Sequence, residues 1–192
     1  DLVFDAKGAK TNIIAIYVNG EPGNEHWYTG AGLYRSVHLI HSKLVHIDPL
    51  SSYFPAEVSA GENVPGEAST STATVQPQVG LVNENSVAVT VGVVVRVLDA
   101  EEKLVGTATQ TASVSGSESL VVRLPAMTIS SPNLWGIQSP YLYTVVTEIV
   151  DTSSKQELDS VNTTLGIRSI HWDYDRGFFL NGENIKLRGF CH

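Results

Sequence analysis

Valine recurs at every second position between Val87 and Val97, within the segment VAVTVGVVVRV. Successive side chains of a β-strand point to opposite faces, so a period of two places all of these valines on one face, whereas a helix would spread them around its circumference. The opposite face is more mixed and includes Ala88, Thr90 and Gly92. The pattern therefore predicts a strand whose odd-numbered valines, from Val87 to Val97, are buried.

Similar short segments on both sides of this strand predict further strands. Upstream, Ala73–Val82 places Val75, Val79 and Leu81 in phase. Pro77 within it predicts a bulge or an edge position, because proline donates no backbone hydrogen bond. Downstream, the expected strands are Leu104–Val114, Ser119–Leu124, Tyr141–Val150 and Glu157–Leu165. Strands and turns that alternate at intervals of about ten residues are typical of an antiparallel sandwich.

We therefore predict an all-β chain with negligible helix, in which residues from about Leu44 to Gly166 form one Ig-like antiparallel β-sandwich. The Cys…Trp…Cys framework of antibody domains is missing from this stretch of sequence. A plain immunoglobulin-like or fibronectin-III-like sandwich is accordingly the better interpretation.

The remaining segments give separate signals. Asn12–Val18 is apolar and β-branched and stops at an Asn-Gly pair, and Leu33–Ile40 places apolar side chains on one face, so both are expected to be strands. Phe54–Thr72 is rich in turn-forming residues and predicts a long loop. Phe178–Leu187 encloses another Asn-Gly pair and predicts a hairpin, because both central residues of a type I′ turn need positive φ. Ile185–Phe190 then has the apolar character of a further strand.

Composition and charge limit the classes of partner that the chain could bind. The chain has 20 acidic and 12 basic residues, a formal net charge of −8 and no run of Lys or Arg. This excludes the electrostatic footprint of a nucleic-acid-binding protein, whereas a neutral ligand such as a sugar is compatible with it. No segment approaches the roughly 20 apolar residues of a membrane span, so no membrane partner is expected. The single cysteine, Cys191, excludes an intramolecular disulfide.

Two features bear on processing. The sequon Asn162-Thr163-Thr164 would permit N-glycosylation in a secretory host. The chain opens on Asp1 without a methionine and within a strand-like pattern, which favours a natural N-terminus further upstream.

Few side chains qualify for catalysis or metal binding. Asp173 and Asp175 form the one tempting carboxylate pair, but their position beside a hairpin favours a turn-stabilising or solvated role. His38, His41 and His46 are too irregularly spaced for one strand face, which argues against a metal site.

Aromatic side chains could stack on sugar rings, but structural roles fit them better. Arg35, in an apolar strand, is expected to bridge carboxylates or backbone carbonyls of its own domain. Structural roles are expected for Trp27, Tyr28, Tyr34, Trp135, Tyr141 and Tyr143.

Three motifs, in order along the chain, resemble glycoside hydrolase family 2, the β-galactosidase/β-glucuronidase type. Trp27–Arg35 (WYTGAGLYR) is similar to the signature that closes the family's jelly-roll domain. Leu134-Trp135 followed by Ser139–Tyr143 is similar to the L-W-x-x-x-x-P-Y-L-Y motif of its second, Ig-like domain. Gly166–Arg168, Phe178–Gly182 and Ile185–Gly189 resemble the run that enters the third domain, a (β/α)8 barrel.

The resemblance implies three parts. Residues 1–43 would be the C-terminal part of the jelly-roll domain, 44–166 the Ig-like sandwich, and 167–192 a linker hairpin with the first strand of the catalytic barrel. The parent enzyme, meaning the full polypeptide to which this chain would belong, is then expected to be a retaining glycosidase acting on terminal β-glycosidic bonds, with β-galactosides as the favoured substrates. The alternative is a free-standing Ig-like carbohydrate-binding or adhesion module without enzymatic activity.

The resemblance also bears on the site. Retaining glycosidases need two carboxylic groups about 5 Å apart, one as acid/base and one as nucleophile, and the family's two glutamates lie on later barrel strands. We therefore assign no catalytic residue, no metal and no cofactor to this chain. Common members continue with Val-Asn-Arg/Lys-His-Glu, where this chain has Phe190-Cys191-His192. Cys191 and His192 would lie at the rim that holds the active site of such barrels, so both are predicted to bind substrate.

The partners expected on this basis are the glycoside substrate, reached through the barrel domain, and the remainder of the chain's own polypeptide. Homo-oligomerisation of the parent enzyme stays open.

Overall fold

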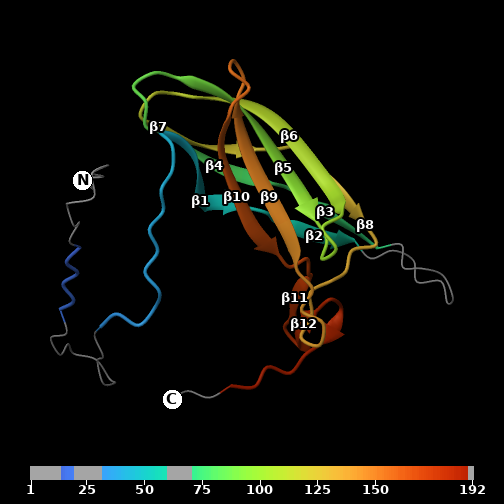
Figure 1. Ribbon diagram of the computed structural model, residues 1–192. Coiled ribbons are helices and arrows are strands. Elements are labelled where there is room, and N and C mark those ends of the chain that lie inside the picture. Colours follow the sequence, from blue (N-terminus) through green and yellow to red (C-terminus); the bar gives the residue numbers. More distant parts are fainter. Residues whose placement is uncertain (1–13, 20–31, 60–70, 190–192) are drawn as a thin grey trace. The chain divides into compact units, whose positions relative to one another are not determined.

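The computed structural model describes residues 14–19, 32–59 and 71–189 (Figure 1). The chain divides into two units, residues 1–40 and 41–192. Every strand of the described residues belongs to the second unit, and these residues contain no helix. The prediction of an all-β chain is therefore confirmed.

One layer of the sandwich is a four-stranded antiparallel sheet with the predicted valine strand inside it. Its order is β10 (Glu157–Leu165), β9 (Tyr143–Asp151), β5 (Val89–Leu98) and β6 (Leu104–Val114). From Val91 to Leu98, β5 pairs with β6 along one edge and with β9 along the other. The strand with the clearest sequence pattern is thus hydrogen-bonded on both sides.

The second layer consists of two three-stranded antiparallel sheets that follow one another. The first contains β1 (Val45–Tyr53), β4 (Gln78–Asn83) and β7 (Glu118–Arg123). The second contains β2 (Ala56–Ser59), β3 (Thr72–Val75) and β8 (Met127–Ser130). Along the chain, β1 leads into β2, β3 into β4 and β7 into β8, so each strand of one sheet is continued by a strand of the other.

A row of prolines separates these two sheets. Pro55, Pro77 and Pro125 each lie in one of the three short connections. The backbone N–H of Gln76 donates to the carbonyl of Pro55, and that of Leu124 donates to the carbonyl of Pro77, both at 3.0 Å. Because proline has no N–H, a regular ladder cannot run through these positions. The sequence predicts a bulge or an edge position at Pro77 within one strand. The structure instead ends β3 before Pro77 and begins β4 after it, so the irregularity is a break between two strands in the middle of the layer.

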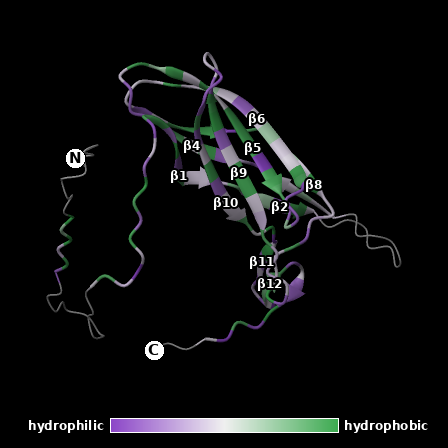
Figure 2. Cartoon of the chain, viewed as in Figure 1, coloured by the Kyte–Doolittle hydropathy of each residue, from purple (hydrophilic) through white to green (hydrophobic). Residues whose placement is uncertain are grey.

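The core lies between the two layers and is rich in valine. Hydrophobic residues recur along the strands of both layers (Figure 2). Val91, Val93, Val95 and Val97 are fully buried, at 0% exposure, as the alternation predicts. The facing strands of the second layer contribute Val75, Val79 and Leu81, in the predicted phase, to the same cluster.

The prediction is wrong at Val87, which is 65% exposed. The strand starts only at Val89, which is half-buried. The preceding residues form a bend, in which the carbonyl of Val87 accepts a hydrogen bond from Asn83 Nδ2 at 2.8 Å. A bend has no period of two, so the valine pattern continues in the sequence beyond the strand that buries it.

The two layers are joined along one side by side chains of β1 and β10. Asp159 Oδ2 accepts a hydrogen bond from the backbone N–H of Ile47 at 2.9 Å. Lys43 Nζ donates to the carbonyl of Glu157 at 2.7 Å. Lys43, just before β1, contacts Glu157 at the start of β10, and Ile47, further along β1, contacts Asp159, further along β10. The contacts advance in the same order along both segments, so the two edge strands run in the same direction.

A separate small sheet follows the sandwich along the chain. It contains β11 (Ile170–Asp173), β12 (Gly177–Leu180) and β13 (Glu183–Asn184). Leu180 pairs with Glu183 across Asn181 and Gly182, whose φ angles are 52° and 82°. The predicted Asn-Gly hairpin, with both turn residues at positive φ, is confirmed.

Three predicted strands do not form within the described residues. The parts of Asn12–Val18, Leu33–Ile40 and Ile185–Phe190 that are described contain no strand. Their apolar side chains are largely exposed, for example Tyr17 at 88% and Val37 at 71%. Apolar alternation selects a face, but a strand also needs a run of hydrogen bonds to a neighbouring strand. The backbone N–H of Ile185 donates to the carbonyl of Phe178 in β12 at 2.9 Å, but the described parts of the three segments form no strand.

The loop predicted over Phe54–Thr72 is also wrong in part. Residues 56–59 form β2, which pairs with β3 from Ala56 to Ser59. Ala56 and Val58 pack against the core, so this four-residue strand is held by its partners rather than by a pattern of its own.

The register of β5 gives a direct test of the core. Val95→Ala removes two buried methyl groups and leaves a cavity, so we expect the free energy of unfolding to fall by about 2 kcal/mol. Val87→Ala makes the same chemical change at an exposed site and should alter stability by less than about 0.5 kcal/mol. Urea unfolding of both variants measures the difference, and equal losses would contradict the register.

Candidate functional site

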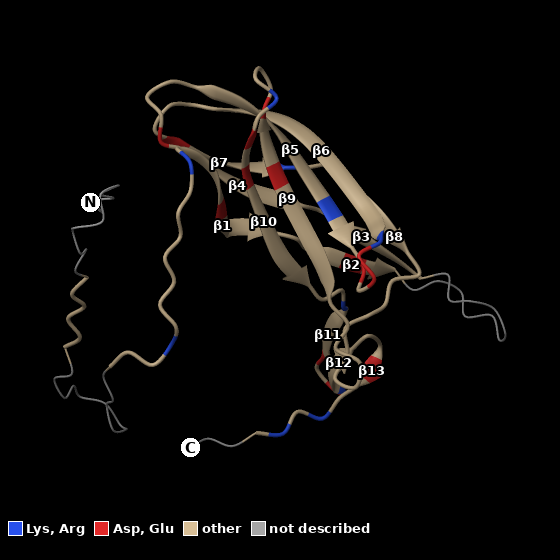
Figure 3. Ribbon diagram, in the orientation of Figure 1, with Lys and Arg blue, Asp and Glu red and all other residues tan. Residues whose placement is uncertain are grey.

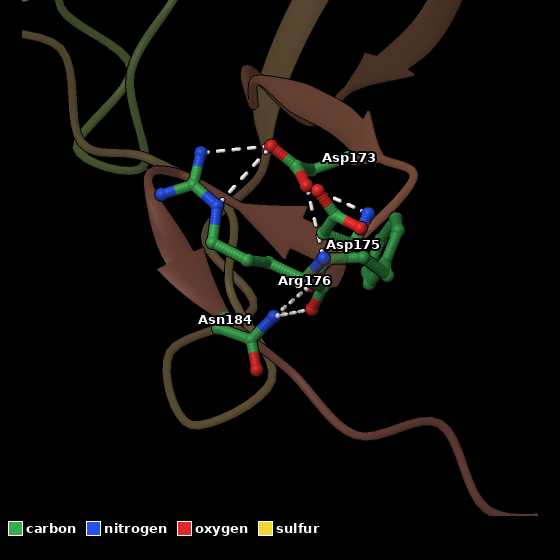
Figure 4. A network of polar contacts seen from close by, with 5 residues as sticks. Asp173, Asp175, Arg176 and Asn184 are labelled. Atoms are coloured by element: carbon green, nitrogen blue, oxygen red, sulfur yellow. Dashed lines mark hydrogen bonds and ion pairs between the residues drawn. The ribbon is translucent and has the colours of Figure 1, made fainter.

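The acidic segment between β11 and β12 is organised as a tight turn (Figure 4). Asp173 Oδ1 accepts hydrogen bonds from the backbone N–H groups of Asp175 at 3.0 Å and Arg176 at 2.9 Å. Asp173 Oδ2 accepts from Arg176 Nε at 3.1 Å and Nη2 at 2.8 Å. Asn184 Nδ2 donates to the carbonyl of Arg176 at 2.6 Å, which joins the turn to β13.

This geometry fixes the electrostatics of Asp173. The bond from the Arg176 side chain, followed by the bonds from backbone N–H groups, holds the pKa of the Asp173 carboxyl below its ordinary value of 3.8. A glycosidase general acid needs the opposite shift, since it must stay protonated near neutral pH. The predicted turn-stabilising role of Asp173 is therefore confirmed.

Other carboxylates with lowered pKa values serve similar local roles. The pKa of Asp48 is lowered first by its hydrogen bond from the Ser51 hydroxyl, in the bulge of β1. The pKa of Asp151 is lowered by the backbone N–H groups of Ser154 and Ser153, in the turn after β9. Each carboxylate accepts hydrogen bonds from its own turn, which leaves it poorly placed for proton transfer to a substrate.

Charged residues are sparse on β5, β6 and β9, three of the four strands of the first sheet (Figure 3). Arg96 of β5 and Glu148 of β9 form an ion pair there, with a quarter to a third of each side chain exposed. The pair crosses between adjacent strands and reinforces their register rather than forming an acidic centre.

The aromatic residues of the sandwich have structural roles, as predicted. Tyr143 is 3% exposed, and its hydroxyl accepts the backbone N–H of Asn133 at 2.8 Å. Burial raises the pKa of this hydroxyl above 10.0. Tyr141 packs edge-on against Tyr143, with ring centroids 5.0 Å apart, and accepts the N–H of Ala100 at 3.0 Å.

Trp135 is held between the sandwich and the hairpin. The Arg168 guanidinium carbon lies 5.1 Å from the centre of its ring. A Cβ added at Gly166 would lie 3.2 Å from Trp135 Cβ and Cγ, so a larger residue there would require the Trp135 side chain to shift by a few tenths of an ångström.

The first motif is only partly described. Trp27 and Tyr28 lie outside the described residues. Tyr34 is 86% exposed, and the Arg35 guanidinium carbon lies 5.3 Å from the centre of the Tyr34 ring. The bridge from Arg35 to carboxylates or carbonyls stays a prediction.

Two of the open depressions on the surface of the second unit have volumes of about 530 and 410 Å³. The larger lies between the loop at residues 136–139 and the hairpin, and the smaller lies beside the end of β10. The two contain one carboxylate, that of Glu183, among their lining residues. One carboxylate cannot perform a reaction that uses an acid and a separate nucleophile.

The predicted substrate-binding residues, Cys191 and His192, lie outside the described residues. Over residues 14–19, 32–59 and 71–189, no group of three or more His, Cys, Asp or Glu side chains is arranged to hold a metal ion. No helix in the same ranges is long and apolar enough to span a membrane.

Comparison with known proteins identifies the family. The sequence profile of glycosyl hydrolases family 2 matches residues 63–168, slightly more than half of the chain. The chain belongs to glycosyl hydrolases family 2. The matched region contains β3 to β10, so most of the valine-rich sandwich lies within the part of the chain that the family profile describes.

Curated relatives match the family 2 chain along nearly its whole length. It is 33% identical over 194 aligned residues to a beta-galactosidase of Bacteroides ovatus, which covers 100% of this chain and 21% of that protein. It is 31% identical to a beta-glucuronidase of Bacteroides fragilis, covering 96% of this chain and 26% of that protein. The chain thus spans between a fifth and about a quarter of the length of these relatives.

Solved structures agree. A family 2 member from Bacteroides cellulosilyticus superposes with a TM-score of 0.66 at 27% identity, over 77% of this chain and 19% of that one. A beta-glucuronidase of the same family superposes with a TM-score of 0.60 at 26% identity, over 76% of this chain and 15% of that one.

Sequence reasoning missed the use made of Asn181. The Asn-Gly pair predicted the turn, but the Asn181 amide bonds to Ser169 and to Trp135, which are 12 and 46 residues away. A type I′ turn needs positive φ from Asn181 but makes no use of its side-chain amide. The partners of that amide are brought to it only by folding, so the sequence carries no direct signal for them.

The Asp173 turn gives a prediction on pH. In the wild-type chain the Asp173 carboxyl should titrate below 3.8, and Arg176→Gln should raise its pKa by removing the largest cause of the shift. Because the pKa is lowered in the folded chain, the ionised carboxylate stabilises the hairpin at pH values above its ordinary pKa of 3.8. This contribution is lost as the pH falls through the lower pKa of the folded chain. NMR titration of the Asp173 carboxyl carbon measures this pKa in the wild type and in Arg176→Gln.

Arg188→Gln is the matched control, because it removes an arginine of the same segment outside this network. A shift of equal size in both variants would attribute the effect to net charge rather than to the Arg176 contact.

Proposed function

We propose that this family 2 chain is the non-catalytic connecting segment of a retaining glycoside hydrolase. Residues 1–43 would be the end of its jelly-roll domain, 44–166 its Ig-like sandwich, and 167–192 the hairpin and first strand of its (β/α)8 barrel. The observation that carries the proposal is the alignment with the beta-galactosidase of Bacteroides ovatus. That alignment uses the whole chain but only 21% of the relative.

The chemistry would be supplied from outside this segment. Double displacement at a sugar needs two carboxylic groups about 5 Å apart, facing one bound ring. Among the described residues, Asp48, Asp151 and Asp173 accept hydrogen bonds within their own turns. Of the two depressions described above, one is lined by a single carboxylate, that of Glu183, and the other by none. These observations support a scaffold role, and the family resemblance implies that the two glutamates lie on later barrel strands of the parent enzyme.

The substrate class we propose is a terminal β-glycoside, with a β-galactoside as the favoured sugar. The relative named a beta-galactosidase is 33% identical, against 31% and 29% for two relatives named beta-glucuronidases. Because this margin is narrow, the experiments below use both sugars.

Cys191 and His192 are the residues of this chain proposed to reach the substrate. If residues 185–190 become the first barrel strand in the parent enzyme, both side chains fall at the carboxyl end of that strand. Active sites of (β/α)8 barrels are built at this rim. An imidazole there could hydrogen-bond a sugar hydroxyl or orient the nucleophile.

The isolated chain is expected to be inactive. It should hydrolyse neither nitrophenyl β-galactoside nor nitrophenyl β-glucuronide, because the two carboxylic groups are not supplied, whereas the parent enzyme should turn over at least one of them. Release of nitrophenolate, assayed side by side for both proteins, measures this. Turnover by the purified chain that disappears on a substitution within it would contradict the scaffold role.

His192→Ala in the parent enzyme tests the proposed rim position. Losing a contact to the reacting sugar should lower kcat/KM at least tenfold, which corresponds to about 1.4 kcal/mol of transition-state stabilisation. The melting temperature should stay close to that of the wild type. Normal kinetics, or a variant that merely unfolds, would assign His192 to packing.

A further inference from the structure

The Asn181 side chain reaches out of its own turn and joins two other segments. Its backbone N–H donates to the carbonyl of Ser169 at 2.9 Å. Its Oδ1 accepts the backbone N–H of Ser169 at 3.0 Å, and its Nδ2 donates to the carbonyl of Trp135 at 2.9 Å. The side-chain oxygen of the amide therefore binds the connection between β10 and β11, at Ser169. Its nitrogen binds the loop between β8 and β9, at Trp135.

This contact continues into the sandwich core. The backbone N–H of Trp135 donates to the carbonyl of Ile167 at 2.8 Å. Ile167 is fully buried, at 0% exposure, and Leu180, next to Asn181, is buried at 6%. A hydrogen-bonded path thus runs from the core through Ile167 and Trp135 to the hairpin turn.

Neighbouring residues pack on this path. The Arg168 guanidinium lies over the Trp135 ring, and Gly166 lies close to Trp135 Cβ and Cγ. A Cβ added at Gly136, which follows Trp135, would be in ordinary van der Waals contact with Asn181 Nδ2, at 3.9 Å. A turn that served only to reverse the chain would need no such contacts, since any residue that tolerates positive φ could occupy the first position.

We propose that Asn181 is a positioning residue of the parent enzyme. Its amide fixes the direction in which the chain leaves the sandwich, and so the alignment of the barrel segment that starts a few residues later. This inference rests on the proposed function. Reacting groups must be held in near-attack geometry, and an error of about 1 Å far from the chemistry can cost about a hundredfold in rate. A single amide at this junction can therefore influence catalysis without touching the substrate.

Two substitutions in the parent enzyme separate the amide from the turn. Asn181→Gly keeps the left-handed backbone and the backbone bond to Ser169 but removes the side chain. Asn181→Asp keeps an acceptor for Ser169 and replaces the donor by an oxygen that repels the Trp135 carbonyl. Glu183→Gln is the matched control, an exchange of carboxylate for amide at the exposed first residue of β13, directly after the turn.

The measurement is kcat and KM for nitrophenyl β-galactoside and β-glucuronide, well below the melting temperature of each variant. We expect kcat of both Asn181 variants to fall at least tenfold with KM within twofold of the wild type, because misalignment weakens interactions made in the transition state. Glu183→Gln should match the wild type. Hydrogen exchange at the Ser169 amide should quicken in Asn181→Gly, which reports loss of the contact itself.

Other outcomes overturn the inference in distinguishable ways. A lower melting temperature with unchanged kcat in both Asn181 variants would make Asn181 a purely structural residue and leave the proposed function intact. If the wild-type parent enzyme hydrolyses neither substrate, the proposed function fails and the positioning role fails with it.

Discussion

Burial of alternate valines on β5 is the constraint on which the rest of the sandwich depends. β5 pairs on both edges, so its register fixes those of β6 and β9, and a slip of one residue would turn the whole apolar face outward. The buried face then sets where the second layer must lie, since only strands carrying apolar residues in phase, such as β4, can cover it. The remaining strands and turns are consistent with this one alignment.

The sequence predicts those parts of the fold that depend on local chemistry. A period of two identified β5, and the Asn-Gly pair identified the turn between β12 and β13, because both follow from backbone geometry alone. The predictions fail where a partner decides the outcome. Leu33–Ile40 has a good strand pattern but no neighbouring strand among the described residues, whereas Ala56–Ser59 has a poor pattern and is held by β3. Pro77 alone predicted one irregularity, but its alignment with Pro55 and Pro125 depends on strand pairing that no local pattern reveals.

The candidate site divides in the same way. The position of Asp173 beside a hairpin was enough to predict a turn role, since hydrogen bonds from nearby backbone N–H groups are local. The function of Asn181 was not predictable, because Trp135 is brought to its amide only by the folding of the sandwich. The proposed substrate-binding residues depend on still more distant partners. The family could be identified because its motifs are local in the sequence. The sugar could not, because the residues that would select it are proposed to lie in the barrel domain.

The join between β1 and β10 has a consequence for distances. Because these two strands run in the same direction, the polypeptide enters the sandwich near Val45 and leaves it near Leu165 at the opposite end. The nine residues of β10 correspond to a length of about 30 Å at roughly 3.3 Å per residue. An antiparallel arrangement of the two strands would have brought the incoming and outgoing chain together at one end. The sandwich is therefore a spacer of one strand length, and its span is set by the number of residues in its edge strands rather than by any loop.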